Sequence, residues 1–167
     1  MNTFKRNNGE VLTISIIFIA IAVTIFMFIL AIFMSHINTV LYNLKIDMYT
    51  LNKSAIIAIN KGKTSIDNFS YNEKVYKNEF IKGLKMNYEL DENLENQRKL
   101  INRIEIIEYK IYEDNKKDLY TGKKCDGRTL HTVIKVKIQP IILKEFLEEI
   151  FIFEIHEDVA LNSMIME

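Results

Sequence analysis

A run of 24 residues without a charged side chain, residues 11–34, constrains this chain most strongly. Ile, Phe, Leu, Met and Ala dominate it, and the polar interruptions are Thr13, Ser15 and Thr24. At 1.5 Å per residue, a helix of this length spans about 36 Å, which exceeds the roughly 30 Å of hydrocarbon in a bilayer. Apolar side chains surround such a helix on all sides, which favours a membrane span over a buried helix of a soluble protein.

A cleaved secretory signal is the nearest competing interpretation of this run. The apolar part of such a signal is usually about 7 to 15 residues long and ends in a small-x-small cleavage site. The run here ends in the segment Phe33-Met34-Ser35-His36-Ile37, which contains no such site, and no cysteine directly follows that would carry a lipid. We therefore expect a retained anchor, with residues 11–35 as the transmembrane helix and the lipid bilayer as its partner.

The charges that flank this segment predict its orientation. Lys5 and Arg6 precede it, whereas the first basic residue on its far side is Lys45. Positive charges are enriched on the cytoplasmic side of membrane proteins. Residues 1–10 are thus predicted to form a cytoplasmic leader, and residues 36–167 an extracellular α+β domain of a single-pass protein of the cell membrane.

The helical pattern continues beyond the apolar run but becomes one-sided. Its apolar residues recur at alternating spacings of four and three, at Ile37, Leu41, Leu44, Met48, Leu51 and Ala55. This period predicts one long helix over residues 11–59, ended by Gly62, with a stripe that packs on the protein's own sheet. Dimerisation through the same stripe, over about three heptads, is the alternative.

The remainder of the chain predicts one more helix and a sheet. An amphipathic helix is expected over residues 72–88, with an apolar face made of Tyr76, Phe80, Leu84 and Tyr88. Alternation of apolar and polar residues predicts strands over residues 103–113 and 130–139 and a third around 151–160. In the first of these strands, the apolar side is expected to carry Ile107, Tyr109 and Ile111. An exposed connection over residues 114–129 is expected to join the first two strands.

These elements define the predicted fold class. It is α+β, with a long N-terminal transmembrane-to-amphipathic helix, a further helical segment and a C-terminal antiparallel sheet of about three strands. Such a small sheet with one apolar face is not stable when that face is bare. The amphipathic half of the long helix is therefore expected to cover it.

The sequence shows no arrangement of residues typical of an active site or a metal centre. The three histidines, His36, His131 and His156, lack the helical spacing of metal ligands, and a solvated strand end explains Glu157-Asp158 beside the last of them. Cys125 is the only cysteine, so it has no intramolecular disulfide partner. No Gly-rich phosphate loop, nucleophile elbow or Cys-x-x-Cys pair occurs. We expect no enzymatic activity, no catalytic residue, no metal and no cofactor.

The charge balance also excludes a class of partner. Lys and Arg number 22, and Asp and Glu also number 22, so the formal net charge is zero. Nucleic-acid binding depends on a concentrated positive field. We therefore expect no nucleic-acid partner.

The first 60 residues resemble the pilin and pseudopilin class. The resemblance lies in a short basic leader, Lys5-Arg6-Asn7-Asn8, a Gly9-Glu10 junction and an apolar helix that becomes amphipathic before a small β domain. Within this class the chain is most similar to TadE-like minor pilins of low-GC Gram-positive bacteria. The resemblance implies that a prepilin peptidase cuts between Gly9 and Glu10. It also implies a glutamate at the fifth mature position, where this chain has Ile14.

Two interpretations of the N-terminus follow, and each leads to its own function. If Gly9-Glu10 is a processing site, the protein is a pilin-like subunit or assembly component of a surface pilus or secretion machine. Its partners are then other pilin-like subunits or membrane assembly proteins. If Glu10 instead marks the headgroup boundary, the protein is a membrane-tethered extracellular binding or accessory module with an uncleaved anchor.

Overall fold

The computed structural model describes residues 3–61, 72–113, 117, 122, 124, 127–139 and 151–161, with the side chains of these residues except 3–8 and 10. The predicted helix stop at Gly62, most of the 114–129 connection and Cys125 lie outside the described residues. Contacts divide the chain into two compact units, Met1–Val40 and Leu41–Glu167.

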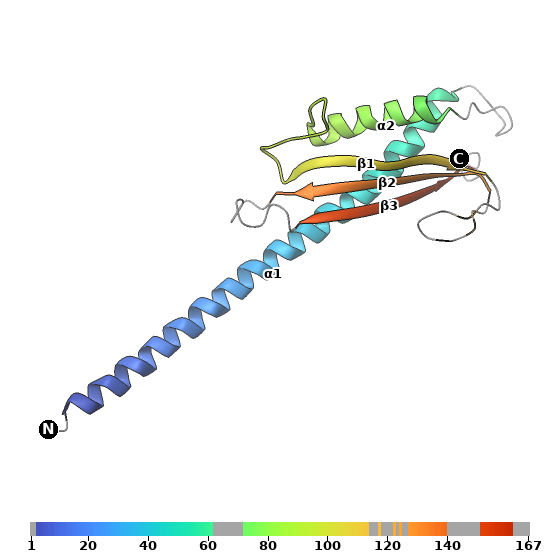
Figure 1. The fold of residues 1–167 in the computed structure, drawn as a ribbon. Coiled ribbons are helices and arrows are strands. Elements are labelled where there is room, and N and C mark those ends of the chain that lie inside the picture. Colours follow the sequence, from blue (N-terminus) through green and yellow to red (C-terminus); the bar gives the residue numbers. More distant parts are fainter. Residues whose placement is uncertain are drawn as a thin grey trace. The chain divides into compact units, whose positions relative to one another are not determined.

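The elements follow one another as two helices and three strands (Figure 1). They are α1 (Thr3–Ile59), α2 (Glu73–Tyr88), β1 (Ile101–Tyr112), β2 (Thr129–Ile138) and β3 (Ile152–Ala160). The strands form a single antiparallel sheet in the order β1-β2-β3, so β2 is the central strand. This layout confirms the predicted α+β fold class.

Helix α1 begins earlier than the sequence predicted. It starts at Thr3 instead of residue 11, so most of the predicted leader belongs to the helix. The prediction placed the helix start at Val11, the first residue of the charge-free run. Lys, Arg and Glu are nevertheless good helix formers, and a helix that is already nucleated propagates through them at little cost.

The predicted stripe on the second half of α1 is confirmed as a packing surface. Ile37, Leu44, Met48 and Ala55 are buried, while Leu41 and Leu51 are partly buried. Within the unit Leu41–Glu167, the Asn52 amide donates a hydrogen bond of 3.0 Å to the Thr132 hydroxyl of β2. The second half of α1 therefore packs on the sheet of its own chain.

Helix α2 covers the same face of the sheet beside β1 (Figure 1). The Phe80 ring lies 5.4 Å from the Tyr109 ring of β1, and Tyr109 is the register partner of Thr132. Gly83 brings the two helices together, since a Cβ at this position would lie 2.3 Å from the Leu51 side chain. Glycine inside a helix costs about 1 kcal/mol relative to alanine. Here that cost is associated with close contact between α1 and α2.

The ends of α2 agree with the sequence pattern. Asn72 is the N-cap, because its side chain accepts a hydrogen bond of 3.2 Å from the Val75 backbone N–H. Glu89 ends the helix in the left-handed conformation, with φ of 54°, and its N–H donates to the Lys85 carbonyl. The predicted apolar face is buried at Tyr76, Phe80 and Leu84. The fourth member, Tyr88, donates a hydrogen bond of 2.5 Å to Asp47 of α1.

A bulge in β1 makes one predicted orientation wrong. The β1–β2 register shifts between Ile106 and Glu108, and the extra residue, Ile107, is 41% exposed instead of facing the core. A bulge resets the period-two alternation of a strand. Before it, Ile104 pairs with buried Val136. After it, the predicted core position of Tyr109 is confirmed, since this residue is 8% exposed.

Candidate functional site

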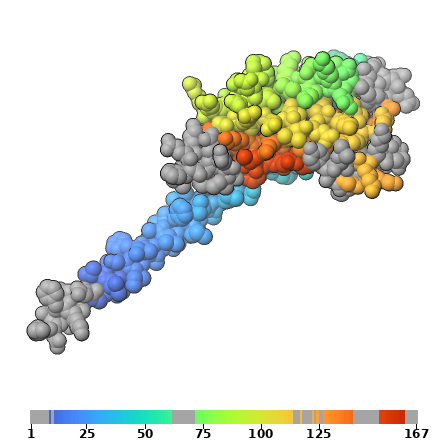
Figure 2. Space-filling view, viewed as in Figure 1, coloured from blue at the N-terminus to red at the C-terminus, as the bar shows by residue number. Residues whose placement is uncertain are grey.

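The apolar run of α1 is the most exposed apolar surface described. Among the described residues, one helical stretch, Val11–Ile59, is long and apolar enough to cross a membrane. Its most apolar window has a mean hydropathy of 3.2 and no buried residue. Most large side chains over residues 11–34 are 43% to 68% exposed (blue in Figure 2). This segment fits a single-pass membrane protein.

The polar residues within the run are satisfied inside the helix. The hydroxyls of Thr13, Ser15 and Thr24 donate to the carbonyls of Gly9, Val11 and Ala20, at 2.9, 2.9 and 2.8 Å. An unsatisfied polar group in hydrocarbon costs several kcal/mol. These bonds remove that cost, so the three hydroxyls are compatible with a lipid environment.

The predicted processing junction lies inside α1. Gly9 is exposed, and no atom lies within 4 Å of where a Cβ would stand. Its carbonyl accepts the hydrogen bond of Thr13. Glycine lowers helix propensity by about 1 kcal/mol relative to alanine. The peptide bond between Gly9 and Glu10 is thus an accessible and comparatively weak point of the helix.

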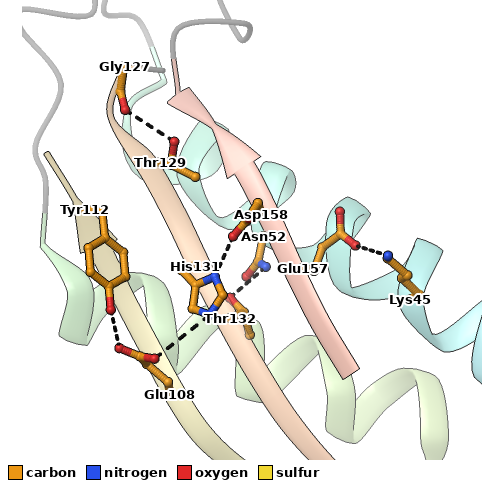
Figure 3. Close-up of polar contacts among 10 residues, drawn as sticks. All are labelled: Lys45, Asn52, Glu108, Tyr112, Gly127, Thr129, His131, Thr132, Glu157 and Asp158. Atoms are coloured by element: carbon orange, nitrogen blue, oxygen red, sulfur yellow. Dashed lines mark hydrogen bonds and ion pairs between the residues drawn. The ribbon is translucent and has the colours of Figure 1, made fainter. Parts of the chain in front are cut away.

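A polar cluster occupies the sheet face opposite the two helices, which we call the outer face (Figure 3). His131 of β2 is 1% exposed, and its Nδ1 lies 2.5 Å from Oδ1 of Asp158 on β3. On its other side, Nε2 lies 3.9 Å from Oε2 of Glu108 on β1. The Tyr112 hydroxyl donates to the same Glu108 carboxylate at 2.8 Å. His156 lies beside this group, with its ring 5.9 Å from that of His131.

The register of the sheet brings this cluster together. His131 is directly opposite Asp158, and Val133 is opposite both Glu108 and His156. His131 thus shares a hydrogen bond with Asp158, whereas its contact with Glu108 at 3.9 Å is electrostatic only. Within the described part of the chain, no group of three His, Cys, Asp or Glu residues could hold a metal ion. We therefore interpret the cluster as a structural link across three strands.

An ion pair connects β3 to α1 on the helix-covered face. Nζ of Lys45 lies 3.8 Å from Oε2 of Glu157, whose side chain is 13% exposed. Burial raises the pKa of the Glu157 carboxyl, Lys45 lowers it in part, and the charge of Asp158 raises it further. The net upward direction means that burial outweighs the ion pair, as is common for partly buried charges.

Glu157→Gln is therefore expected to stabilise the protein near neutral pH. Because the folded pKa of Glu157 is raised, this residue contributes stability below its unfolded pKa of about 4.3, and this contribution is lost as the pH rises through the folded pKa. Glutamine does not ionise, so the variant keeps this stability at neutral pH. We expect a gain of up to about 1 kcal/mol at pH 7 that vanishes near pH 4, measured by urea unfolding at both pH values. An equal or lower stability of the variant at pH 7 would contradict this assignment.

A shallow recess lies elsewhere on the outer face. It has a volume of about 180 Å³ and is lined by Arg103, Glu105, Lys135, Lys137 and Ile152. Three of these five residues are cationic and one is anionic. The sequence prediction gave no role to any of them, and carboxylates stand beside the cations, since Glu95 pairs with Arg103 and Glu154 is the register partner of Lys135.

Sequence reasoning also missed the histidine cluster. It explained Glu157-Asp158 as a solvated strand end, which is wrong for Glu157, whose side chain is 13% exposed beside Lys45. It treated each residue separately because the register between strands was unknown. His36 is exposed on α1, apart from this cluster in the chain. The one available signal was the polar character of alternate positions in the second and third strands.

Comparison with known proteins does not extend this description. No family model, no curated protein and no solved structure matches the chain.

Proposed function

We propose that this protein is a pilin-like, TadE-like structural subunit or assembly component of a surface pilus or secretion machine. The proposal rests on α1, which has an exposed apolar first part and a second part that belongs to the core of an α+β unit. Such a helix needs an apolar partner along its exposed part. Lipid supplies this partner before assembly, and the helices of other subunits or of membrane assembly proteins supply it afterwards.

The polar groups of the exported unit favour a structural role over catalysis. The most concentrated titratable cluster surrounds His131, which is 1% exposed and therefore not accessible to a substrate. In the outer-face recess, Arg103, Glu105 and Lys135 are exposed to solvent, and Lys137 is partly buried. We therefore propose that the protein is not an enzyme, and that the unit Leu41–Glu167 lies outside the cell membrane with the N-terminus in the cytoplasm.

A membrane-tethered module remains the second candidate. Ile14 stands where the pilin class carries a glutamate. The Gly9-Glu10 junction is helical, so a peptidase would need to open a turn of α1. These two observations favour an anchor that is never cleaved, in which case the exported unit binds a partner at the cell surface.

Cleavage at Gly9 separates the two candidates. In cells with an active prepilin peptidase, mass spectrometry of the native membrane form is expected to find Glu10 as the N-terminus. Gly9→Val should abolish the cut, because a branched side chain crowds the scissile position. Ala22→Val adds the same branched side chain farther along α1, away from the scissile peptide; it should be cleaved like the wild type and serves as the matched control.

The opposite result has a clear physical meaning. An intact chain from Met1 to Glu167 would retain Lys5 and Arg6, and drawing either into the bilayer centre costs about 2.5 to 3.5 kcal/mol. Such a chain resists extraction into a filament. It would overturn the pilin-like proposal in favour of the tethered module.

A further inference from the structure

The two helices that cover the sheet differ in the sides that they expose. The exposed positions of α2 carry charged side chains at Glu73, Lys74, Glu79 and Lys82. In the described residues 41–59 of α1, only Lys45 carries a charge at an exposed position, and it lies 3.8 Å from Glu157 of its own chain. Asp47 and Lys53 are partly buried. Charged residues normally occupy the solvent side of an amphipathic helix. α2 follows this rule, whereas α1 does not.

Apolar side chains take the place of charges on this side of α1. Tyr42, Ile46 and Tyr49 are 67%, 46% and 40% exposed, and they recur at spacings of four and three. The helical period places them in one row, while Leu44 and Met48 on another side of the helix are buried in the core. We call this row the outer stripe. Its spacing is the one with which one helix packs along another.

The size of the outer stripe restricts its partner. Because a fully covered tyrosine buries about 150 to 250 Å², contact between two such partly exposed stripes removes on the order of 600 Å² from water. Stable complexes of freely diffusing proteins bury about 1,200 Å² or more. The stripe is therefore too small to hold a partner from solution. It suits a partner that the membrane already holds beside it, because tethering raises the effective concentration.

A second copy of the chain meets this condition. Tyr42 follows Met34, the last residue of the apolar run, by eight residues. Every copy anchored by that run therefore carries its stripe at the same chain distance from the membrane and in the same direction. In a parallel pair each residue of the stripe faces its own counterpart, so Ile46 meets Ile46 and the tyrosines meet tyrosines. Lys45 at the flank then faces the uncharged Thr50 of the second copy.

We propose that the outer stripe, Tyr42, Ile46 and Tyr49, is the interface of a parallel homodimer between membrane-anchored copies of this chain. The next position of the row is Lys53, where two copies would bring like charges together, so the contact ends before it. The pair leaves the buried face of α1 on the sheet of its own chain. It requires no cut at Gly9, so it is compatible with a pilin-like subunit and with a tethered module, and its failure would leave both open.

Disulfide trapping in intact membranes tests the pair. Ile46→Cys is introduced into the full chain together with Cys125→Ser, so that one thiol is present. Mild oxidation is expected to link most of the chain into dimers, because the two Ile46 positions face each other. Ser54→Cys, at an exposed position about a third of a turn around α1, measures random collisions and should be trapped at least about fivefold less. Equal trapping of the two variants, or none at position 46, would overturn the proposal.

A like-charge substitution tests the same contact. Tyr42→Lys, added to the Ile46→Cys chain, places two ammonium groups opposite each other and should lower trapping by about fivefold or more. Ser54→Lys adds the same charge to α1 away from the stripe and should change trapping by less than about twofold. Gly9→Val should leave it unchanged. Equal circular-dichroism spectra verify that the variants fold. Equal effects of the two lysines would mean that no specific contact exists at Tyr42.

A photo-crosslinker at Tyr49 identifies the occupant of the stripe. Replacement of Tyr49 by p-benzoylphenylalanine keeps an aromatic ring in the stripe, and irradiation of native membranes links this ring to whatever lies against it. The expected product has twice the mass of the chain and yields peptides of this sequence alone. A product that contains a different protein, or the absence of any product, would overturn the assignment of a second copy.

Discussion

Val136→Asp is expected to unfold the unit Leu41–Glu167. Val136 lies on the central strand with 0% exposure, opposite Ile104 on β1 and Phe153 on β3. An aspartate there would bury a charge without a partner, at a cost of several kcal/mol. Domains of this size are stable by only about 5 to 15 kcal/mol. Near-ultraviolet circular dichroism of the tyrosines, of which the chain has eight, should report the loss of packing.

Ile107→Asp is the matched control for this substitution. It introduces the same residue into the neighbouring strand, but Ile107 is the exposed residue of the β1 bulge. Surface substitutions usually change stability by less than about 0.5 kcal/mol. A native spectrum is therefore expected for Ile107→Asp. Unfolding of this control would mean that strict alternation extends through β1 and that no bulge exists.

Phe80→Ala is expected to lower the free energy of unfolding by about 3 to 5 kcal/mol, the usual range for deleting a buried phenyl ring. Phe80 is 0% exposed, and its ring contacts Tyr109 of β1. The cavity would lie between α2 and the sheet, so α2 should lose much of its docking energy. Urea unfolding of the full chain in neutral detergent gives this value.

Met86→Ala on the same helix provides the comparison for Phe80→Ala. Met86 is 73% exposed, so its truncation should leave the urea midpoint nearly unchanged. If the two variants were equally stable, α2 would contribute no packing to the sheet. That result would contradict the described arrangement of α2 over β1.

The elements set by local chemistry were predictable from the sequence. Asn72 marks the start of α2 because its short polar side chain caps a backbone N–H. The four-residue spacing of Tyr76, Phe80 and Leu84 identified the buried face. In β3, Phe153 and Ile155 share a face with the paired core residues Val136 and Ile134, as their alternation predicted.

The features that depend on pairing between strands were not predictable. Ile106 and Ile107 are both apolar, so their residue types do not indicate where the alternation shifts. The contact between His131 and Asp158 joins residues 27 positions apart and exists only through the β2–β3 register. The opposed charges of Arg103 and Lys137 have the same origin. Residue type indicates the face of a strand, whereas register decides which polar groups meet.

The Lys45–Glu157 pair has a consequence for how copies of this protein avoid aggregation. β3 is an edge strand of the sheet, and an edge invites backbone pairing with another chain. Inward-pointing charges are one of the devices that discourage such pairing. Glu157 is a charge of this kind, since it faces the helix-covered side next to the edge. Glu157 therefore discourages backbone pairing between the β3 edges of two copies.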